Sequence, residues 1–102
     1  MDDQDTIATE AKEGRQLTIT ILNEDDGRQY QLQAGPGTPI HALLQRFYAQ
    51  ELNRERRPDD RLRCEADGED VFQFNELHLR DYLEAGHCVR LIWRFASASG
   101  GA

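Results

Sequence analysis

The clearest pattern in the sequence is the alternation of apolar and polar side chains in two short stretches, residues 16–22 and 29–34. Alternation with a period of two is typical of a strand that is buried on one face only. The residues between the two stretches are polar and include Gly27, which suits a left-handed turn position. We therefore predict a hairpin whose first strand turns three side chains toward the core: Leu17, Ile19 and Ile21.

The next segment has the three-and-four spacing of a helix, up to about residue 54. We expect Thr38 to cap this helix and Pro39 to occupy its first turn, because the N–H that proline lacks is not needed there. Residues 54–60 read as a solvated loop, and Pro58 prevents the helix from continuing. Four apolar side chains form the predicted buried stripe of the helix: Ile40, Leu43, Leu44 and Phe47.

A third strand is predicted over residues 61–66, where the alternation returns. Its inward side chains are Leu62 and Cys64, whereas Arg63 points away from the core. A short strand is then expected at residues 71–74, after a turn. The sheet therefore continues beyond the helix.

One helical turn within residues 75–83, closed by Gly86, and a last strand over residues 87–95 complete the pattern. The core-facing side chains of the last strand are predicted to be Val89, Leu91 and Trp93. The order of hairpin, helix, strand, single turn and final strand predicts an α+β fold of the β-grasp type. In this fold a mixed sheet packs one main helix against one face, and the two layers enclose a single core.

The two cysteines, Cys64 and Cys88, have neither the spacing of a metal site nor the number of a disulfide framework. Cys88 precedes an inward residue and is predicted to point outward, on the other side of the sheet from Cys64. Side chains on opposite faces of a sheet do not meet disulfide geometry, so we expect two free thiols. The three histidines also lack ligand spacing, and we expect no metal, no cofactor and no catalytic residue.

Composition and charge narrow the classes of function. The 102-residue chain carries a net charge of −7, which argues against nucleic acid binding because that depends on Lys and Arg side chains neutralising phosphates. No apolar run is long enough to span a bilayer and no secretory signal is evident, so we expect a cytoplasmic protein that does not bind membranes. Residues 1–14 are acidic and aperiodic, and we expect a disordered leader before a domain over residues 15–95.

The C-terminal carboxylate of the chain is the leading candidate for a reactive group. Residues 96–102 form a predicted flexible tail that contains Gly100 and Gly101. Glycine has no Cβ, so such a pair can lie in a crevice too narrow for other residues. All basic residues except Lys12, which lies in the leader, are arginines. Two interpretations are open: a genome-wide preference for arginine codons, or the advantage to a protein handled as an activated acyl group of lacking amines that would attack it.

Several short sequence motifs follow one another along residues 15–101 in an order that is found in a known protein family. They are Thr38 at the start of the helix, Arg61-Leu62 in the third strand, Asp67-Gly68 at the following turn, Leu79-Arg80-Asp81-Tyr82, and Val89-Arg90-Leu91-Ile92-Trp93-Arg94-Phe95 ahead of the glycines. Together with the Gly-Gly ending, these motifs resemble ubiquitin and the bacterial ubiquitin-like modifiers of conjugation operons. The resemblance implies a transferred protein modifier and not an enzyme.

The resemblance implies a reaction at the end of the chain. A JAB-type zinc peptidase would remove Ala102, and an activating enzyme would adenylate the Gly101 carboxylate with ATP. The acyl group would pass to a conjugating enzyme and then to an amine of a protein target, forming an isopeptide bond. Gly100 and Gly101 are therefore the predicted conjugation residues, and Lys12 is a candidate acceptor for a second copy. Bacterial systems of this kind are associated with antiviral defence.

The outward face of the last strands is the predicted docking face for partners. Its residues are Arg63, Arg90, Ile92 and Arg94. The resemblance puts Arg63 where the apolar recognition patch of ubiquitin has an isoleucine, and Arg94 where ubiquitin has an arginine that its activating enzyme reads. Two other functions stay open: a sulfur carrier with a C-terminal thiocarboxylate, and a non-covalent β-grasp adaptor. Ala102 and the acidic leader count against the carrier.

Overall fold

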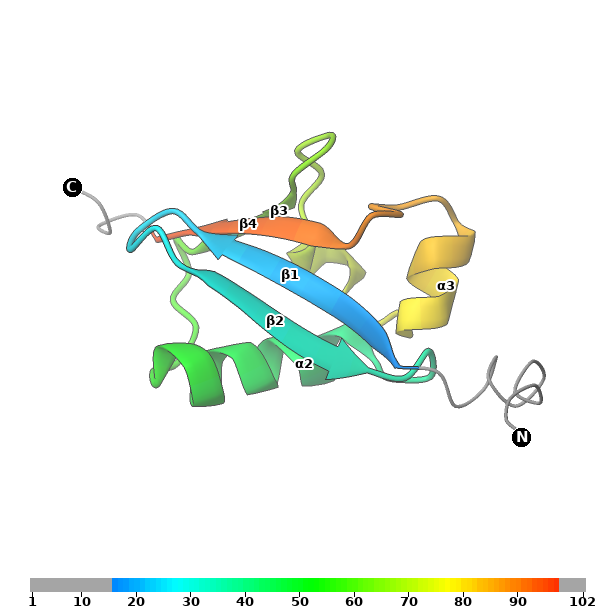
Figure 1. The fold of residues 1–102 in the computed structure, drawn as a ribbon, viewed down its shortest axis with the longest axis horizontal. Helices are drawn as coiled ribbons and strands as arrows, with labels where there is room; N and C mark the ends of the chain where they lie inside the picture. Colours follow the sequence, from blue (N-terminus) through cyan, green and yellow to red (C-terminus); the bar gives the residue numbers. More distant parts are fainter. Residues whose placement is uncertain (1–15, 98–102) are drawn as a thin grey trace.

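Two layers make up residues 16–97, the part of the chain that the computed structural model describes (Figure 1). One layer is a four-stranded sheet and the other is a helix that crosses one face of the sheet, with a second short helix at the end of the sheet. In chain order the elements are β1 Leu17–Asn23, β2 Gln29–Ala34, α2 Ile40–Arg46, η1 Phe47–Leu52, β3 Arg61–Cys64, η2 Phe72–Phe74, α3 Leu79–Glu84 and β4 Ile92–Ala96.

The sheet has the strand order β2-β1-β4-β3. The first and last strands, β1 and β4, are neighbours in the centre and run parallel, whereas β2 and β3 pair antiparallel at the two edges. The parallel pair is possible because the chain between its strands includes the helix that covers the sheet. This mixed sheet with one main helix confirms the predicted α+β β-grasp fold.

The core lies between the sheet and α2, as the periodicity predicted. Ile19 and Ile21 of β1 are fully buried, whereas Leu17 is only partly buried at the end of the strand. Trp93 is among the largest fully buried side chains, and its indole N–H donates a hydrogen bond to the Tyr82 hydroxyl at 3.2 Å. The helical stripe is buried as predicted: Ile40, Leu43, Leu44 and Phe47.

The start and end of the main helix differ from the prediction. Pro39 is extended and pairs through its backbone with His78, so the helix begins only at Ile40 and Thr38 makes no side-chain cap. The last turns, η1, widen to π-helical geometry and end at Asn53, whose left-handed φ of 55° stops the helix before Pro58. No helix in residues 16–97 has the length and apolar character needed to cross a bilayer.

The short strand predicted at residues 71–74 is a 3₁₀ turn, η2. The backbone N–H of Val71 donates to the carbonyl of Leu62, but the chain then turns so that the Phe74 N–H reaches back to the Val71 carbonyl. Phe72 and Phe74 pack half-buried at the edge of the core in place of alternating across a sheet.

The last strand is shorter at its start than predicted and one residue longer at its end. Cys88 and Leu91 have left-handed φ angles of 40° and 53°, which break the period of two before β4 begins at Ile92. Val89, predicted to face the core, is instead 66% exposed. Leu91 and Trp93 are buried as expected.

The same break in periodicity overturns the prediction of two free thiols. Cys64 and Cys88 form a disulfide, with their Cα atoms 5.6 Å apart. The prediction was wrong because alternation along a strand does not apply to Cys88, which lies in a loop that turns its side chain inward. The disulfide therefore joins the end of β3 to the loop that precedes β4.

Candidate docking face and tail exit

The main helix covers one face of the sheet and leaves the other uncovered (Figure 1). The uncovered face carries arginine side chains beside partly buried aliphatic ones. Arg63 of β3 and Arg94 of β4 are exposed, and Ile92 lies two residues before Arg94 on the same face. They share this face because successive side chains of a strand alternate while Trp93 and Phe95 point to the core. The structure thus brings together three of the four predicted partner-binding residues.

Arg94 is held in place by acidic neighbours on both sides. Its Nη1 atom lies 3.1 Å from Oε2 of Glu24, and its Nη2 atom lies 3.6 Å from Oε2 of Glu65. The hydrogen bond with Glu24 raises the pKa of the Arg94 guanidinium above its ordinary value. These side chains are partly exposed, so the pairs orient Arg94 more than they stabilise the fold.

Arg90, the fourth predicted residue, is not on this strand. It lies in the loop before β4, where the left-handed residues Cys88 and Leu91 break the alternation that would have aligned it with Ile92. Its side chain is exposed beside the exposed Val89. The docking face, as we use the term below, therefore consists of Arg63, Ile92 and Arg94.

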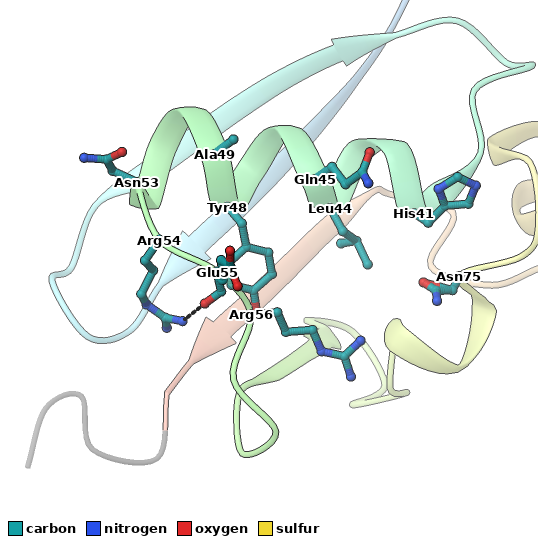
Figure 2. A pocket seen from close by; sticks show the side chains of 10 residues that line it. All are labelled: His41, Leu44, Gln45, Tyr48, Ala49, Asn53, Arg54, Glu55, Arg56 and Asn75. Atoms are coloured by element: carbon teal, nitrogen blue, oxygen red, sulfur yellow. Dashed lines mark hydrogen bonds between the residues drawn. The ribbon is translucent and has the colours of Figure 1, made fainter.

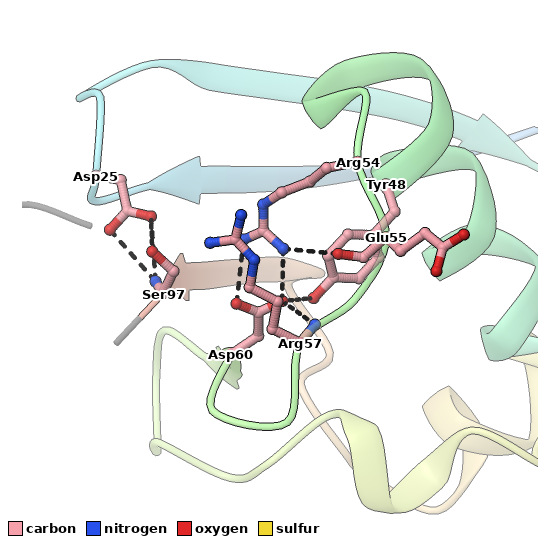
Figure 3. Close-up of polar contacts among 7 residues, drawn as sticks. All are labelled: Asp25, Tyr48, Arg54, Glu55, Arg57, Asp60 and Ser97. Carbon is pink, nitrogen blue, oxygen red and sulfur yellow. Dashed lines mark hydrogen bonds and ion pairs between the residues drawn. The ribbon is translucent and has the colours of Figure 1, made fainter. Parts of the chain in front are cut away.

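The chain leaves the sheet next to the turn between β1 and β2. β4 ends at Ala96, and the carboxylate of Asp25 accepts hydrogen bonds from the backbone N–H and the hydroxyl of Ser97 (Figure 3). The residues predicted for conjugation and processing begin three positions later. They and the candidate acceptor lie outside the described residues: Gly100, Gly101, Ala102 and Lys12.

A buried carboxylate lies on the helix side of the tail exit (Figure 3). The Asp60 side chain is fully buried and accepts hydrogen bonds from the Tyr48 hydroxyl at 2.8 Å and from two guanidinium nitrogens of Arg54 at 3.0 Å. The backbone N–H of Arg57 adds a fourth bond at 2.9 Å. Burial raises the pKa of Asp60, but these donors outweigh burial and hold the pKa below its ordinary value.

The Asp60 network fixes the loop that was predicted to be solvated. The Arg54 guanidinium lies over the rings of Tyr48 and Phe95, at 5.5 and 5.7 Å, and so packs the loop against the end of β4. Sequence reasoning missed this network because nothing in the sequence distinguishes Asp60 from its exposed neighbour Asp59.

A groove of about 670 Å³ lies between the main helix and the segments that carry Arg54, Arg56 and Asn75 (Figure 2). Leu44, Tyr48 and Ala49 supply apolar lining from α2 and η1, and the loop after the helix closes one side with Arg54 and Arg56. The buried Oδ1 atom of Asn75, at the other end, has no hydrogen-bond partner within residues 16–97. No sequence pattern predicts this groove, since it depends on how the loop folds back.

The histidines form no shared site. His87 contacts Glu69 at 2.9 Å and His78 contacts Asp81 at 3.6 Å, whereas His41 lines the groove. Within residues 16–97, no group of three or more His, Cys, Asp or Glu side chains is arranged to hold a metal ion.

Comparisons with known proteins relate this chain to others by fold alone. No protein-family model matches the sequence, and no curated protein matches it. Among solved structures, the solution structure of the UBL domain of yeast Ddi1 superimposes with a TM-score of 0.61 and 19% sequence identity. The match covers 88% of this chain and 98% of that domain. The described part of the chain therefore has a ubiquitin-like fold.

Proposed function

We propose that this chain is a ubiquitin-like protein modifier that is activated at the carboxylate of Gly101. The observation that carries the proposal is the combination of a ubiquitin-like fold with a last strand that ends at Ala96, four positions before Gly100-Gly101 in the sequence. Cleavage after Gly101 by a peptidase of the JAB type removes Ala102 and produces the reactive carboxylate. The chain itself supplies no catalytic side chain and is a substrate of other enzymes.

The proposed chemistry has four steps. The Gly101 carboxylate attacks the α-phosphate of ATP, which gives an acyl-adenylate and releases pyrophosphate. A cysteine thiolate of the activating enzyme displaces AMP to form a thioester, and a conjugating-enzyme thiol takes over the acyl group by exchange. An amine of the protein target then attacks the thioester, forms an isopeptide bond and releases the thiol.

The docking face supports recognition by partner enzymes. Arg63, Ile92 and Arg94 combine exposed guanidinium groups, one of them paired with Glu24 and Glu65, with a partly buried aliphatic side chain, a mixture suited to a partner surface with charged groups around an apolar centre. Arg94 lies three residues before the tail residue Ser97, so a partner bound there is close to the tail exit. One partner enzyme can therefore contact the uncovered sheet face and the tail at the same time.

The disulfide bears on where the protein works. We propose a cytoplasmic location, where the enzymes of such a pathway act, but disulfides are rare in the reducing cytosol. A cytoplasmic location therefore requires that Cys64 and Cys88 are mostly reduced in the cell. Alkylation of cells before lysis, followed by intact mass spectrometry, counts the free thiols; a fully oxidised pair would point to an oxidising compartment.

The decisive experiment uses chains ending at Gly101 and at Ala102. Each is incubated with extract of the native host, with and without ATP, and adducts are resolved on non-reducing gels. We expect the Gly101-terminated chain to form an ATP-dependent, thiol-sensitive adduct, and the Ala102-terminated chain to form one only after loss of the alanine. A Gly101→Val variant of the shorter chain is the control and should form none, because a Cβ blocks a narrow crevice.

The groove favours a second function, the non-covalent adaptor. Its apolar lining of Leu44, Tyr48 and Ala49 and its volume are suited to a side chain or short peptide segment of a partner. An adaptor needs no free Gly101 carboxylate. Absence of any ATP-dependent adduct from either chain, with partner binding that is lost on substitution of the exposed groove residue in Ala49→Asp, would replace the modifier by the adaptor.

A further inference from the structure

Ser97, the first residue after β4, is hydrogen-bonded to the turn between β1 and β2. Ser97 donates its backbone N–H to both carboxylate oxygens of Asp25, at 3.3 and 3.1 Å, and its hydroxyl to Oδ2 at 2.8 Å (Figure 3). The two residues are 72 positions apart in sequence. A contact of this separation depends on the parallel pairing of β1 with β4, which places the β1–β2 turn beside the tail exit.

The turn that carries Asp25 is itself held in a defined shape. The Asp25 N–H donates to Oδ1 of the buried Asn23 at 2.8 Å, and the Glu24 N–H donates to the Phe95 carbonyl at 2.8 Å. Gly27 closes the turn with a left-handed φ of 74°. Asp25 is thus presented to the tail by a preformed loop.

The neighbouring acidic residue, Asp26, makes different hydrogen bonds. Asp26 accepts the Arg28 N–H at 2.8 Å and the Tyr30 hydroxyl at 2.9 Å, so its carboxylate serves the turn. The Asp25 carboxylate is directed at Ser97 instead. The two adjacent aspartates therefore have different partners: Asp26 binds groups within the hairpin, and only Asp25 of the two contacts the tail.

We propose that Asp25 is a positioning residue that clasps Ser97 and sets the direction and free length of the tail presented to the activating enzyme; this rests on the proposed function. With Ser97 held, the four residue steps from Ser97 to Gly101 allow a reach of at most about 14 Å. A tail whose first residue is already ordered loses less conformational freedom when it enters a narrow enzyme channel. Loss of the clasp is therefore expected to weaken productive binding and to leave the chemical step intact.

The first test measures the clasp without any enzyme. In full-length chain, Asp25→Asn removes the charge that Ser97 contacts, and Asp26→Asn is the matched control. We expect the Ser97 amide to exchange its hydrogen about tenfold faster in Asp25→Asn, in line with the loss of a charge-assisted hydrogen bond, and to be unchanged in Asp26→Asn. Ser97→Ala should weaken the contact less, because the backbone N–H remains. Equal exchange in all variants would overturn the clasp.

The second test uses the activating enzyme recovered as the ATP-dependent adduct. For Gly101-terminated chains we expect Asp25→Asn to raise the apparent KM for the chain several-fold with little change in kcat, and Asp26→Asn to match the wild type. Faster Ser97 exchange with an unchanged KM would overturn the positioning role while the modifier function stands. If no chain is charged at all, the proposed function and the positioning role both fail, whatever the exchange rates show.

Discussion

Arg63 on β3 lies directly opposite Arg94 on β4, so two guanidinium groups occupy one cross-strand position on the uncovered face of the sheet. Like charges at directly opposed positions destabilise a sheet. Glu24 and Glu65 flank Arg94 and offset part of this repulsion. An unfavourable pair of arginines at the surface is consistent with a role of their charge in binding a partner. Both arginines belong to the proposed docking face.

Replacing Arg63 by Glu should therefore separate stability from function. The change converts a like-charge pair into an opposite-charge pair with Arg94 and is expected to raise the free energy of unfolding by about 0.2–1 kcal/mol. The same change should reduce charging by the activating enzyme, because it reverses charge on the docking face. Urea unfolding and the adduct assay measure the two effects. Arg80→Glu, exposed on α3, is the control; equal loss of charging in both variants would show only a general charge effect.

Removing the buried carboxylate should be costly. Asp60→Asn leaves Arg54 without its ionic partner and weakens two further contacts, those with the Tyr48 hydroxyl and the Arg57 N–H, and we expect a loss of about 3 kcal/mol in the free energy of unfolding. Asp59→Asn changes the same charge at an exposed neighbour and should stay within about 0.5 kcal/mol of the wild type. Similar midpoints for the two variants in urea would mean that the network does not hold the loop.

The Asp60 network also predicts a dependence on pH. Because the folded-state pKa of Asp60 lies below the ordinary value of 3.8, its contribution is fully present above that value and is lost as the pH falls through the folded-state pKa. The difference in unfolding free energy between wild type and Asp60→Asn should therefore be constant near neutrality and narrow at acidic pH, below about pH 4. A difference that widens in acid would contradict the sign of the pKa shift.

The helix stripe should be essential to the core. Phe47 is fully buried and packs edge-on against Tyr30 and Phe95, at ring-centroid distances of 5.8 and 5.3 Å. Truncation to Ala should cost about 3–5 kcal/mol, a large part of the stability of a domain of this size. Gln50→Ala, on the exposed side of η1, is the control. Near wild-type melting of Phe47→Ala would be incompatible with the helix packing described above.

Reduction of the disulfide should destabilise the domain without abolishing the fold. Cys64 and Cys88 are 24 residues apart, and closing a loop of this length is worth about 3 kcal/mol through the unfolded state. We expect Cys88→Ser, or the wild type in dithiothreitol, to unfold at lower urea concentration by a corresponding amount. Thiol titration of denatured protein before reduction is the control, and two titratable thiols there would show that the bond does not form.

Local sequence patterns were enough to predict the four strands of the sheet and the helix stripe, but they also predicted a strand at residues 71–74 that is a 3₁₀ turn and began the last strand five residues too early. β2 spans the predicted residues 29–34, and Ile19, Ile21 and Phe47 are buried where the periods of two and 3.6 put them. These predictions succeed because a strand or helix that is buried on one face needs apolar residues at the period of that element, and this period is visible in the sequence. The β-grasp order follows from the same elements, since few arrangements bury a single helix face on a single sheet face.

Only the tertiary structure determined the backbone conformation and the contacts of residues just beyond the ends of strands and helices. The left-handed residues Cys88 and Leu91 turn the chain before β4, which pairs Cys88 with Cys64 and exposes Val89. The burial of Asp60 likewise depends on donors from a helix and a loop. Contacts of this kind, including the one between Ser97 and Asp25 across 72 positions, carry no local period in the sequence, because they arise only when distant segments are brought together by the fold.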